Sequence, residues 1–195
     1  MSPDPARRNP HSTAAILRAA LELASEGDWS KVSIEGIAAR AGVGKRTIYR
    51  WWPSKGVIVL DAWVQRLQES LYKRLESADT GDIETDLKQM VRDAYVYTLG
   101  DTLQVLAALI GEAQHDPELF KQMWERLLRP TTERVATRIR RAQEQGQLAA
   151  DIDPYRAIDL IYGQIHHRFL FTPHELDEAF MDDCVDLALR GLRPK

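Results

Sequence analysis

Residues 32–55 read VSIEGIAARAGVGKRTIYRWWPSK, and this stretch decides the fold of the N-terminal part of the chain. Ser33 is placed to cap a short helix whose apolar residues recur at helical spacing, and Gly42 is expected to end it. A second short helix is expected over residues 45–51, before a proline. Residues 36–60 contain no acidic residue. Two short helices joined by a glycine turn inside a basic stretch are typical of a helix-turn-helix.

Basic residues are concentrated in this part of the chain. The whole chain has a net charge of −3 at pH 7, but residues 1–60 hold nine Lys and Arg against five Asp and Glu. The N-terminal part therefore has an excess of four positive charges, and the remainder carries a net charge of −7. This polarity indicates a nucleic acid as the partner of the N-terminal part.

The second short helix is expected to have one buried and one exposed face. At 100° per residue, Ile48 and Trp52 share a face that can pack on the preceding helices, whereas Arg46 and Arg50 project from the opposite side. The planar guanidinium group matches the guanine edge in the major groove, and hydroxyls and helix starts suit phosphates. For Trp51, packing in the core is an open alternative. The predicted DNA-binding residues are Ser33, Lys45, Arg46, Thr47, Tyr49, Arg50, Trp51 and Lys55.

Helical periodicity continues along the chain, and strand-like alternation is rare, so the sequence predicts an all-α protein. A helix from about residue 9 or 12 to Gly27 precedes the helix-turn-helix. The later helices are expected to begin at Ser54 and to cover residues 83–99, 102–115, 117–145, 153–171 and 172–191. The helix over 117–145 should kink near Arg129, because Pro130 removes a backbone hydrogen bond.

The quoted stretch closely resembles the DNA-binding signature of the tetracycline-repressor (TetR) family. The resemblance rests on the A-G-V turn at 41–43, the T-I-Y centre at 47–49 and the P-S-K opening at 53–55, although Trp52 stands where many members have phenylalanine. It implies a homodimer of about nine helices per subunit that binds a two-fold operator. The implied domains are a three-helix DNA-binding domain, residues 1–55, and a C-terminal helical bundle for effector binding and dimerisation, residues 56–195.

The last two helices are apolar on more than one side, so each needs two neighbours. Packing against the same helices of a second copy would supply the missing neighbour in a four-helix interface. The predicted dimer-interface residues are Ile158, Ile161, Ile165, Phe169, Phe180, Val185 and Leu189.

Large side chains of the C-terminal part could line a cavity between helices, although any one of them more often packs in a core. The candidates for the effector pocket are Trp63, Leu67, Tyr95, Leu99, Leu103, Leu106, Ile110, Met123, Trp124, Leu127, Tyr162 and His166.

The sequence thus predicts a ligand-responsive transcriptional repressor rather than an enzyme, with operator DNA and a small-molecule effector as partners and with no metal or cofactor. We expect it in the cytoplasm, because the single cysteine excludes an internal disulfide and no apolar run is long enough to span a bilayer. Two alternatives stay open. One is an α-helical metalloenzyme built on the Glu-x-x-His spacing of Glu112 and His115. The other is an architectural DNA-binding protein without an effector.

Overall fold

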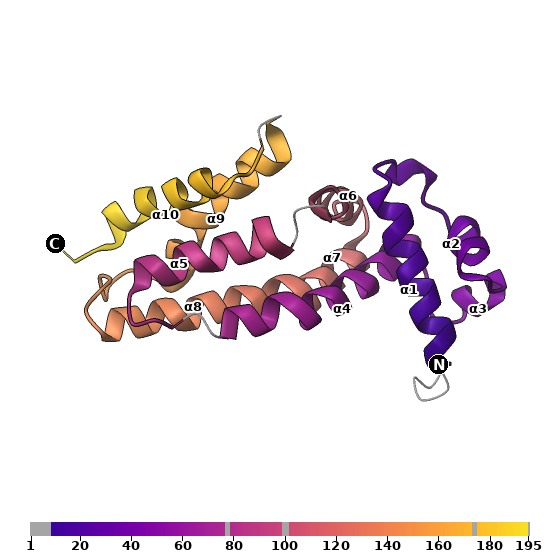
Figure 1. Cartoon of the computed structure of the whole chain (residues 1–195), viewed down its shortest axis with the longest axis horizontal. Helices are drawn as coiled ribbons and strands as arrows, with labels where there is room; N and C mark the ends of the chain where they lie inside the picture. The colour runs from indigo at the N-terminus through magenta and orange to yellow at the C-terminus, as the bar shows by residue number, and fades with distance from the viewer. Residues whose placement is uncertain (1–8, 77–78, 99–101, 173–174, 195) are drawn as a thin grey trace. The chain divides into compact units, whose positions relative to one another are not determined.

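The computed structural model describes residues 9–76, 79–98, 102–172 and 175–194. Most of these residues are helical and none is in a strand, which confirms the predicted all-α fold, and each of the nine predicted helices is present (Figure 1). The chain divides into two compact units. The first comprises Met1–Arg66 and Asp101–Trp124, and the second comprises Leu67–Gly100 and Glu125–Lys195. The first unit is broader than the predicted DNA-binding segment 1–55, because it includes two later helices.

The first unit contains the helix-turn-helix. Its elements are α1 (Pro10–Ser25), a 3-10 turn (Trp29–Lys31), α2 (Ile34–Ala41), α3 (Lys45–Tyr49), the start of α4 (Lys55–Glu76), α6 (Leu103–Ala113) and α7 (Pro117–Met123). The side chain of Asn9 caps α1 by accepting hydrogen bonds from the N–H groups of His11 and Ser12. α1 packs on α2 and α6, and α2 packs on α3, so the helix-turn-helix shares its core with a later helix.

The second unit contains the rest of α4, α5 (Ile83–Arg92), a π-helical segment (Asp93–Thr98), α8 (Arg129–Glu144), α9 (Pro154–Phe171) and α10 (Glu178–Leu192). α10 packs on α5 and α9, and α8 packs on α5 and α9 (Figure 1). Aspartates cap three of these helices by accepting backbone N–H groups, as their short polar side chains favour.

Two predicted helices change form along their length. The helix predicted over 83–99 becomes π-helical at Asp93. The helix predicted over 117–145 is divided into α7 and α8 by a π-helical turn, Trp124–Leu128, directly before Pro130. Pro130 lacks the N–H of a regular helical hydrogen bond, so the preceding turn widens at the predicted place.

The last helix begins later than the sequence predicted. The expected start at Thr172-Pro173 is wrong, because α10 begins at Glu178. Asp177 is its N-cap and accepts the N–H of Phe180 at 2.8 Å. Thr172 instead ends α9, and its hydroxyl donates to the carbonyl of Arg168.

A buried ion pair joins α5 to α8. Asp86 is fully buried and Arg138 is 4% exposed, and Nε of Arg138 lies 2.6 Å from Oδ2 of Asp86. The other carboxylate oxygen accepts the backbone N–H and the hydroxyl of Thr80 at 2.9 and 2.7 Å. Both Nη atoms of Arg138 are buried without a hydrogen-bond partner. The carboxylate of Asp86 is therefore the closest negative charge to the buried guanidinium of Arg138.

The single cysteine, Cys184, lies in the core of the second unit on α10 and is 1% exposed. Burial raises the pKa of its thiol to about 11, so the thiol stays protonated near neutral pH. None of the helices in the described ranges is long and apolar enough to cross a membrane.

Candidate DNA-binding surface and ligand site

Three small residues define the two ends of α2 and the start of α3. Ser33 caps α2, its Oγ accepting the N–H of Gly36 at 3.1 Å. Gly42 ends α2 in the left-handed conformation, with φ of 67°, which glycine adopts without steric cost. Gly44 precedes the first turn of α3. Ser33 therefore has a structural role as a cap, in addition to the phosphate contact that the sequence predicts for it.

The inner face of α3 is fixed to the first unit. Ile48 and Trp52 are 0% and 1% exposed, as the helical spacing predicted. The indole nitrogen of Trp52 donates to Oδ2 of Asp61 on α4 at 2.6 Å. α3 has only five residues, so its orientation depends on this packing and not on its own helical stability.

The outer face of α3 is exposed and basic, as predicted. Its exposed side chains are Lys45, Arg46, Thr47, Tyr49 and Arg50. The guanidinium of Arg50 lies over the ring of half-buried Trp51, 5.2 Å from its centroid. Within the described ranges, neither Arg46 nor Arg50 pairs with a carboxylate, whereas Lys45 lies 2.9 Å from Glu35. The two arginines therefore keep their hydrogen-bond donors for an external acceptor.

The start of α1 lies beside this surface, which the sequence did not predict. Asn9, Ser12 and Thr13 line a recess together with Arg46 and Arg50. Two hydroxyls at a helix start suit phosphate oxygens. In the sequence, Asn9 indicates where α1 begins, but only the packing of α1 shows which side of this helix faces α3.

The side chain of Lys55 contacts other residues of the first unit and does not belong to the exposed basic face of α3. Its ammonium donates to the backbone carbonyl of Trp29 at 2.9 Å and lies 4.9 Å from the centroid of the Trp29 ring. It is also 4.0 Å from Oε2 of Glu112 on α6. The phosphate contact predicted for Lys55 does not fit this placement, because its donors are directed to these internal partners.

Glu112 links α6 to the helix-turn-helix. Its Oε2 accepts the indole N–H of Trp29 at 2.5 Å. A Cβ added at Gly56 would lie 2.8 Å from Oε1 of Glu112 and 2.8 Å from Cδ2 of Leu119, so α4 approaches α6 and α7 closely there. Glu112 was one of two ligands in the metalloenzyme alternative, but the structure uses its carboxylate to hold Trp29. The described residues contain no group of three or more His, Cys, Asp or Glu that could hold a metal ion.

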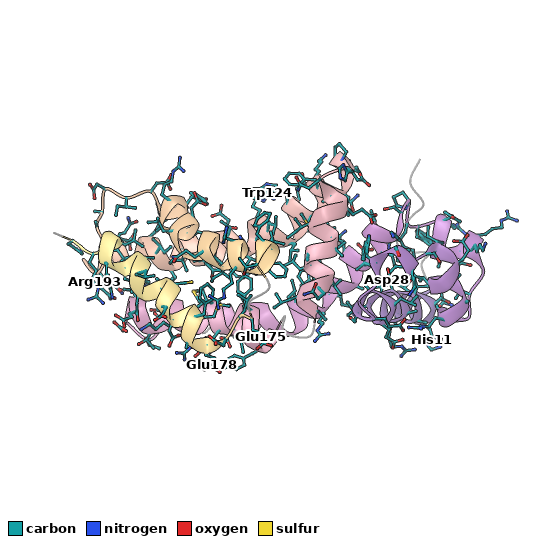
Figure 2. The ribbon with its side chains drawn as sticks, turned by 90° about the horizontal axis from the view of Figure 1, so that it is seen from above. His11, Asp28, Trp124, Glu175, Glu178 and Arg193 are labelled. Carbon is teal, nitrogen blue, oxygen red and sulfur yellow. The ribbon has the colours of Figure 1, made fainter. Side chains whose placement is uncertain are left out.

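The residues predicted for the effector pocket fall in both units. Those buried or half-buried in the first unit are Trp63, Leu103, Leu106, Ile110 and Met123. Those in the second unit include buried Leu67, Tyr95 and Leu127. Leu99 lies outside the described residues. Trp124 is 44% exposed, and its place in a cavity stays a prediction (Figure 2). The indole N–H of Trp63 is buried without a hydrogen-bond partner.

Three of the predicted pocket residues meet in the second unit. Tyr95 lies in the π-helical segment, and Tyr162 and His166 lie one turn apart on α9. The hydroxyl of Tyr95 is 2.7 Å from Nε2 of His166. The three ring centroids lie 6.0 to 6.5 Å from one another. The sequence named these residues, but it could not show that a π-helical turn brings Tyr95 to α9.

Most residues predicted for the dimer interface are part of the core. Ile158, Ile161, Ile165, Val185 and Leu189 are buried within one protomer, so the prediction is wrong for these five. Their apolar face packs on neighbouring helices of the same chain. Phe169 and Phe180 keep part of their surface exposed.

A different face of α9 and α10 is apolar and exposed. Leu160 and Phe171 on α9 are 50% and 76% exposed, and Leu187 on α10 is 54% exposed. Beside Leu160, a groove of about 590 Å³ is lined in part by Gly163 and Phe180. The spacing of Leu160 and Phe171 is i, i+11, which places both on one side of a helix. This surface is defined here as the α9/α10 face.

Two family models match the chain. The model described as "Bacterial regulatory proteins, tetR family" matches residues 16–62, and the model described as "Tetracyclin repressor-like, C-terminal domain" matches residues 77–188. The chain belongs to the TetR family. The first match covers the helix-turn-helix and the second covers most of the remaining chain, so TetR membership extends beyond the DNA-binding motif.

Curated TetR-family relatives cover nearly the whole chain. The "Uncharacterized HTH-type transcriptional regulator YdeS" of Bacillus subtilis is 30% identical over 179 residues, which cover 92% of this chain and 88% of the relative. The "DNA-binding transcriptional repressor TetR" of Mycobacteroides abscessus is 27% identical over 185 residues, which cover 89% and 90%. Transcriptional regulation is therefore the function that this TetR-family chain shares with its relatives.

Solved structures of transcriptional regulators have the same fold. The transcription regulator SCO0332 superposes with a TM-score of 0.72 at 32% identity, covering 94% of this chain and 100% of that chain. The regulator FadR from Bacillus subtilis, solved in complex with stearoyl-CoA, has a TM-score of 0.76 at 18% identity, with 91% and 98% coverage. The second likeness shows the fold alone.

Proposed function

We propose that this TetR-family regulator is a homodimeric repressor that binds a two-fold operator and is released by a small-molecule effector. The observation that carries the DNA-binding part is the outer face of α3. Arg46 and Arg50 are exposed there and pair with no carboxylate in the described ranges, while Ile48 and Trp52 anchor the opposite face. Guanidinium groups held in this way suit the guanine edge in the major groove.

The operator and its sequence preference are tested together. Genomic duplex fragments that bind the purified full-length protein are selected, and one selected site is then titrated at several salt concentrations against a scrambled duplex. Two recognition helices of a dimer are expected to read half-sites about 34–36 Å apart. Binding that does not distinguish the selected site from the scrambled duplex would favour the architectural alternative. Protein that binds no duplex at low salt would refute the proposal.

Arginine variants separate base reading from general attraction to phosphates. Arg46→Ala and Arg50→Ala are each expected to weaken operator binding by about 1 to 3 kcal/mol and to relax the sequence preference. Arg141→Ala is the matched control, because Arg141 is an exposed arginine on α8 in the other unit. Equal losses on operator and scrambled DNA would remove Arg46 and Arg50 from base reading.

The homodimer is proposed to form through the α9/α10 face. Exposed Leu160, Phe171 and Leu187 supply apolar area, and Gly163 has no atom within 4 Å of an added Cβ, so a second helix has room to approach. Phe171→Arg is expected to shift the protein from dimer to monomer in size-exclusion chromatography with light scattering. Phe120→Arg, at an exposed phenylalanine of α7, is expected to leave the dimer intact. A dimer that survives the change at Phe171 would place the interface elsewhere.

Effector release is proposed to act through α4, which begins beside Trp29 and continues into the second unit. A ligand that favours one position of α4 would change the spacing of the two α3 helices, with a coupling free energy of about 1 to 3 kcal/mol. The stearoyl-CoA complex of FadR supports a ligand on this fold. A compound that binds tightly without changing operator affinity would refute its role as effector. We place the protein in the cytoplasm, where its DNA partner is found.

A further inference from the structure

Tyr95, Tyr162 and His166, defined here as the aromatic triad, form a polar cluster in the second unit. Tyr95 is buried, and its hydroxyl is hydrogen-bonded to Nε2 of His166 at 2.7 Å. The ring of Tyr95 is tilted by 46° to that of Tyr162 and lies edge-on to that of His166. The three rings therefore present both ring edges and ring faces, the surfaces that favour contact with another flat aromatic group.

The aromatic triad is uncharged near neutral pH. Burial raises the pKa of both tyrosine hydroxyls and lowers the pKa of His166, and each shift has desolvation as its largest cause. In the described part of the chain, no Lys or Arg forms a hydrogen bond or an ion pair with any of the three side chains. The cluster offers hydrogen bonds without a cation that could compensate a bound anion.

The aromatic triad also keeps accessible surface. The side chain of His166 is exposed and that of Tyr162 is half-buried, although both are desolvated. In the part of the chain that the structure describes, the Tyr162 hydroxyl makes no hydrogen bond, and it is not among the sealed polar atoms. One hydroxyl of the triad is therefore available to a ligand.

We propose that the aromatic triad is the polar anchor of the effector site and that it takes an uncharged aromatic molecule carrying a hydroxyl or carbonyl group. This inference rests on the proposed ligand-responsive function. The Tyr162 hydroxyl donates to or accepts from the polar group of the ligand, and the rings of Tyr95 and His166 contact its aromatic part. A carboxylate or phosphate is disfavoured, because it would lose its hydration beside groups that carry no positive charge.

Three compounds of one ring shape test the ligand class. The full-length protein is titrated at pH 7 by isothermal titration calorimetry with 2-naphthol, naphthalene and 2-naphthoate, which differ in the polar group alone. We expect 2-naphthol to bind about three- to tenfold more tightly than naphthalene, as one net hydrogen bond allows, and 2-naphthoate to bind most weakly. Naphthoate binding as tight as that of naphthol, or no binding of naphthol, would overturn the proposal.

Two tyrosine variants test the position of the site. Tyr162→Phe removes the available hydroxyl and is expected to reduce naphthol affinity to that of naphthalene, about three- to tenfold. Tyr155→Phe is the matched control on the same helix, where the hydroxyl donates to Glu133 at 2.6 Å, and it should bind naphthol like the original protein. Unchanged naphthol affinity in Tyr162→Phe, with a thermal unfolding curve like that of the control, would remove the triad from the site.

Failure of this inference can be told apart from failure of the regulator proposal. Duplex binding is measured separately by fluorescence anisotropy on the same protein preparations. Selective duplex binding without naphthol discrimination would overturn the ligand class and keep the regulator. Protein that binds naphthol more tightly than naphthoate through Tyr162, but binds no duplex, would support the ligand site and overturn the proposal that the protein is a DNA-binding regulator.

Discussion

Replacing Glu112 tests whether α6 holds the helix-turn-helix through Trp29. Oε2 of Glu112 accepts the Trp29 indole N–H at 2.5 Å and lies 4.0 Å from the Lys55 ammonium. A hydrogen bond to a charged acceptor contributes about 1.5 to 3 kcal/mol. The ion pair adds about 0 to 1 kcal/mol, since both side chains keep about a quarter of their surface exposed. Glu112→Ala should therefore lower the free energy of unfolding by about 1.5 to 4 kcal/mol.

Urea denaturation followed by circular dichroism measures this loss. Glu112→Gln keeps an acceptor for the indole and should cost about 1 kcal/mol, whereas Glu144→Ala, at an exposed glutamate of α8, should stay within about 0.5 kcal/mol. In a double-mutant cycle, Trp29→Phe and Glu112→Ala should lose less together than the sum of their separate losses. A loss below about 0.5 kcal/mol for Glu112→Ala, or strictly additive losses, would refute the reasoning.

Three further predictions follow from the packing. Asp86→Ala removes the closest carboxylate of the buried Arg138 guanidinium, leaving Asp79 at 3.7 Å, and should cost about 3 to 5 kcal/mol in urea denaturation. A cost near zero would mean that Asp79 or water compensates Arg138. Gly56→Ala places a Cβ 2.8 Å from the fully buried Leu119 and should cost about 1 to 3 kcal/mol, a prediction that an unchanged midpoint contradicts. Because burial lowers the pKa of His166 in the folded protein, the unfolded chain takes up a proton more readily, and the free energy of unfolding should fall as the pH drops below about 6.5. His166→Gln should reduce that fall when thermal unfolding is compared at pH 7.5 and 5.5.

The helix-turn-helix could be predicted because its determinants are local. Spacing alone separated the buried Ile48 and Trp52 from the exposed Arg46 and Arg50, since each face of a short helix follows from its period. Lys55 shows the limit of this reasoning. Its position at a helix start suited a phosphate, but its ammonium donates to the backbone carbonyl of Trp29 and lies 4.0 Å from Glu112. Glu112 is 57 residues away in sequence, on a helix whose packing the sequence did not reveal.

The C-terminal half was harder to predict in detail. The sequence showed that α9 and α10 have more than one apolar face, but not which face packs within the chain. Aliphatic residues such as Ile161 and Val185 were assigned to the interface and are in fact core residues. Size and hydropathy do not distinguish these two environments. π-helical turns add one residue to a hydrogen-bonded ring, so an assignment of faces at 100° per residue also fails within Asp93–Thr98.

The protonated, buried thiol of Cys184 makes the chain suitable for site-specific spin labelling without prior removal of its own cysteine. A cysteine introduced at exposed Thr47 on α3 would be the reactive thiol of each subunit, so a nitroxide reagent would place one label on each recognition helix. Pulsed electron paramagnetic resonance could then record the separation of the two labels in a dimer directly, with and without an added compound.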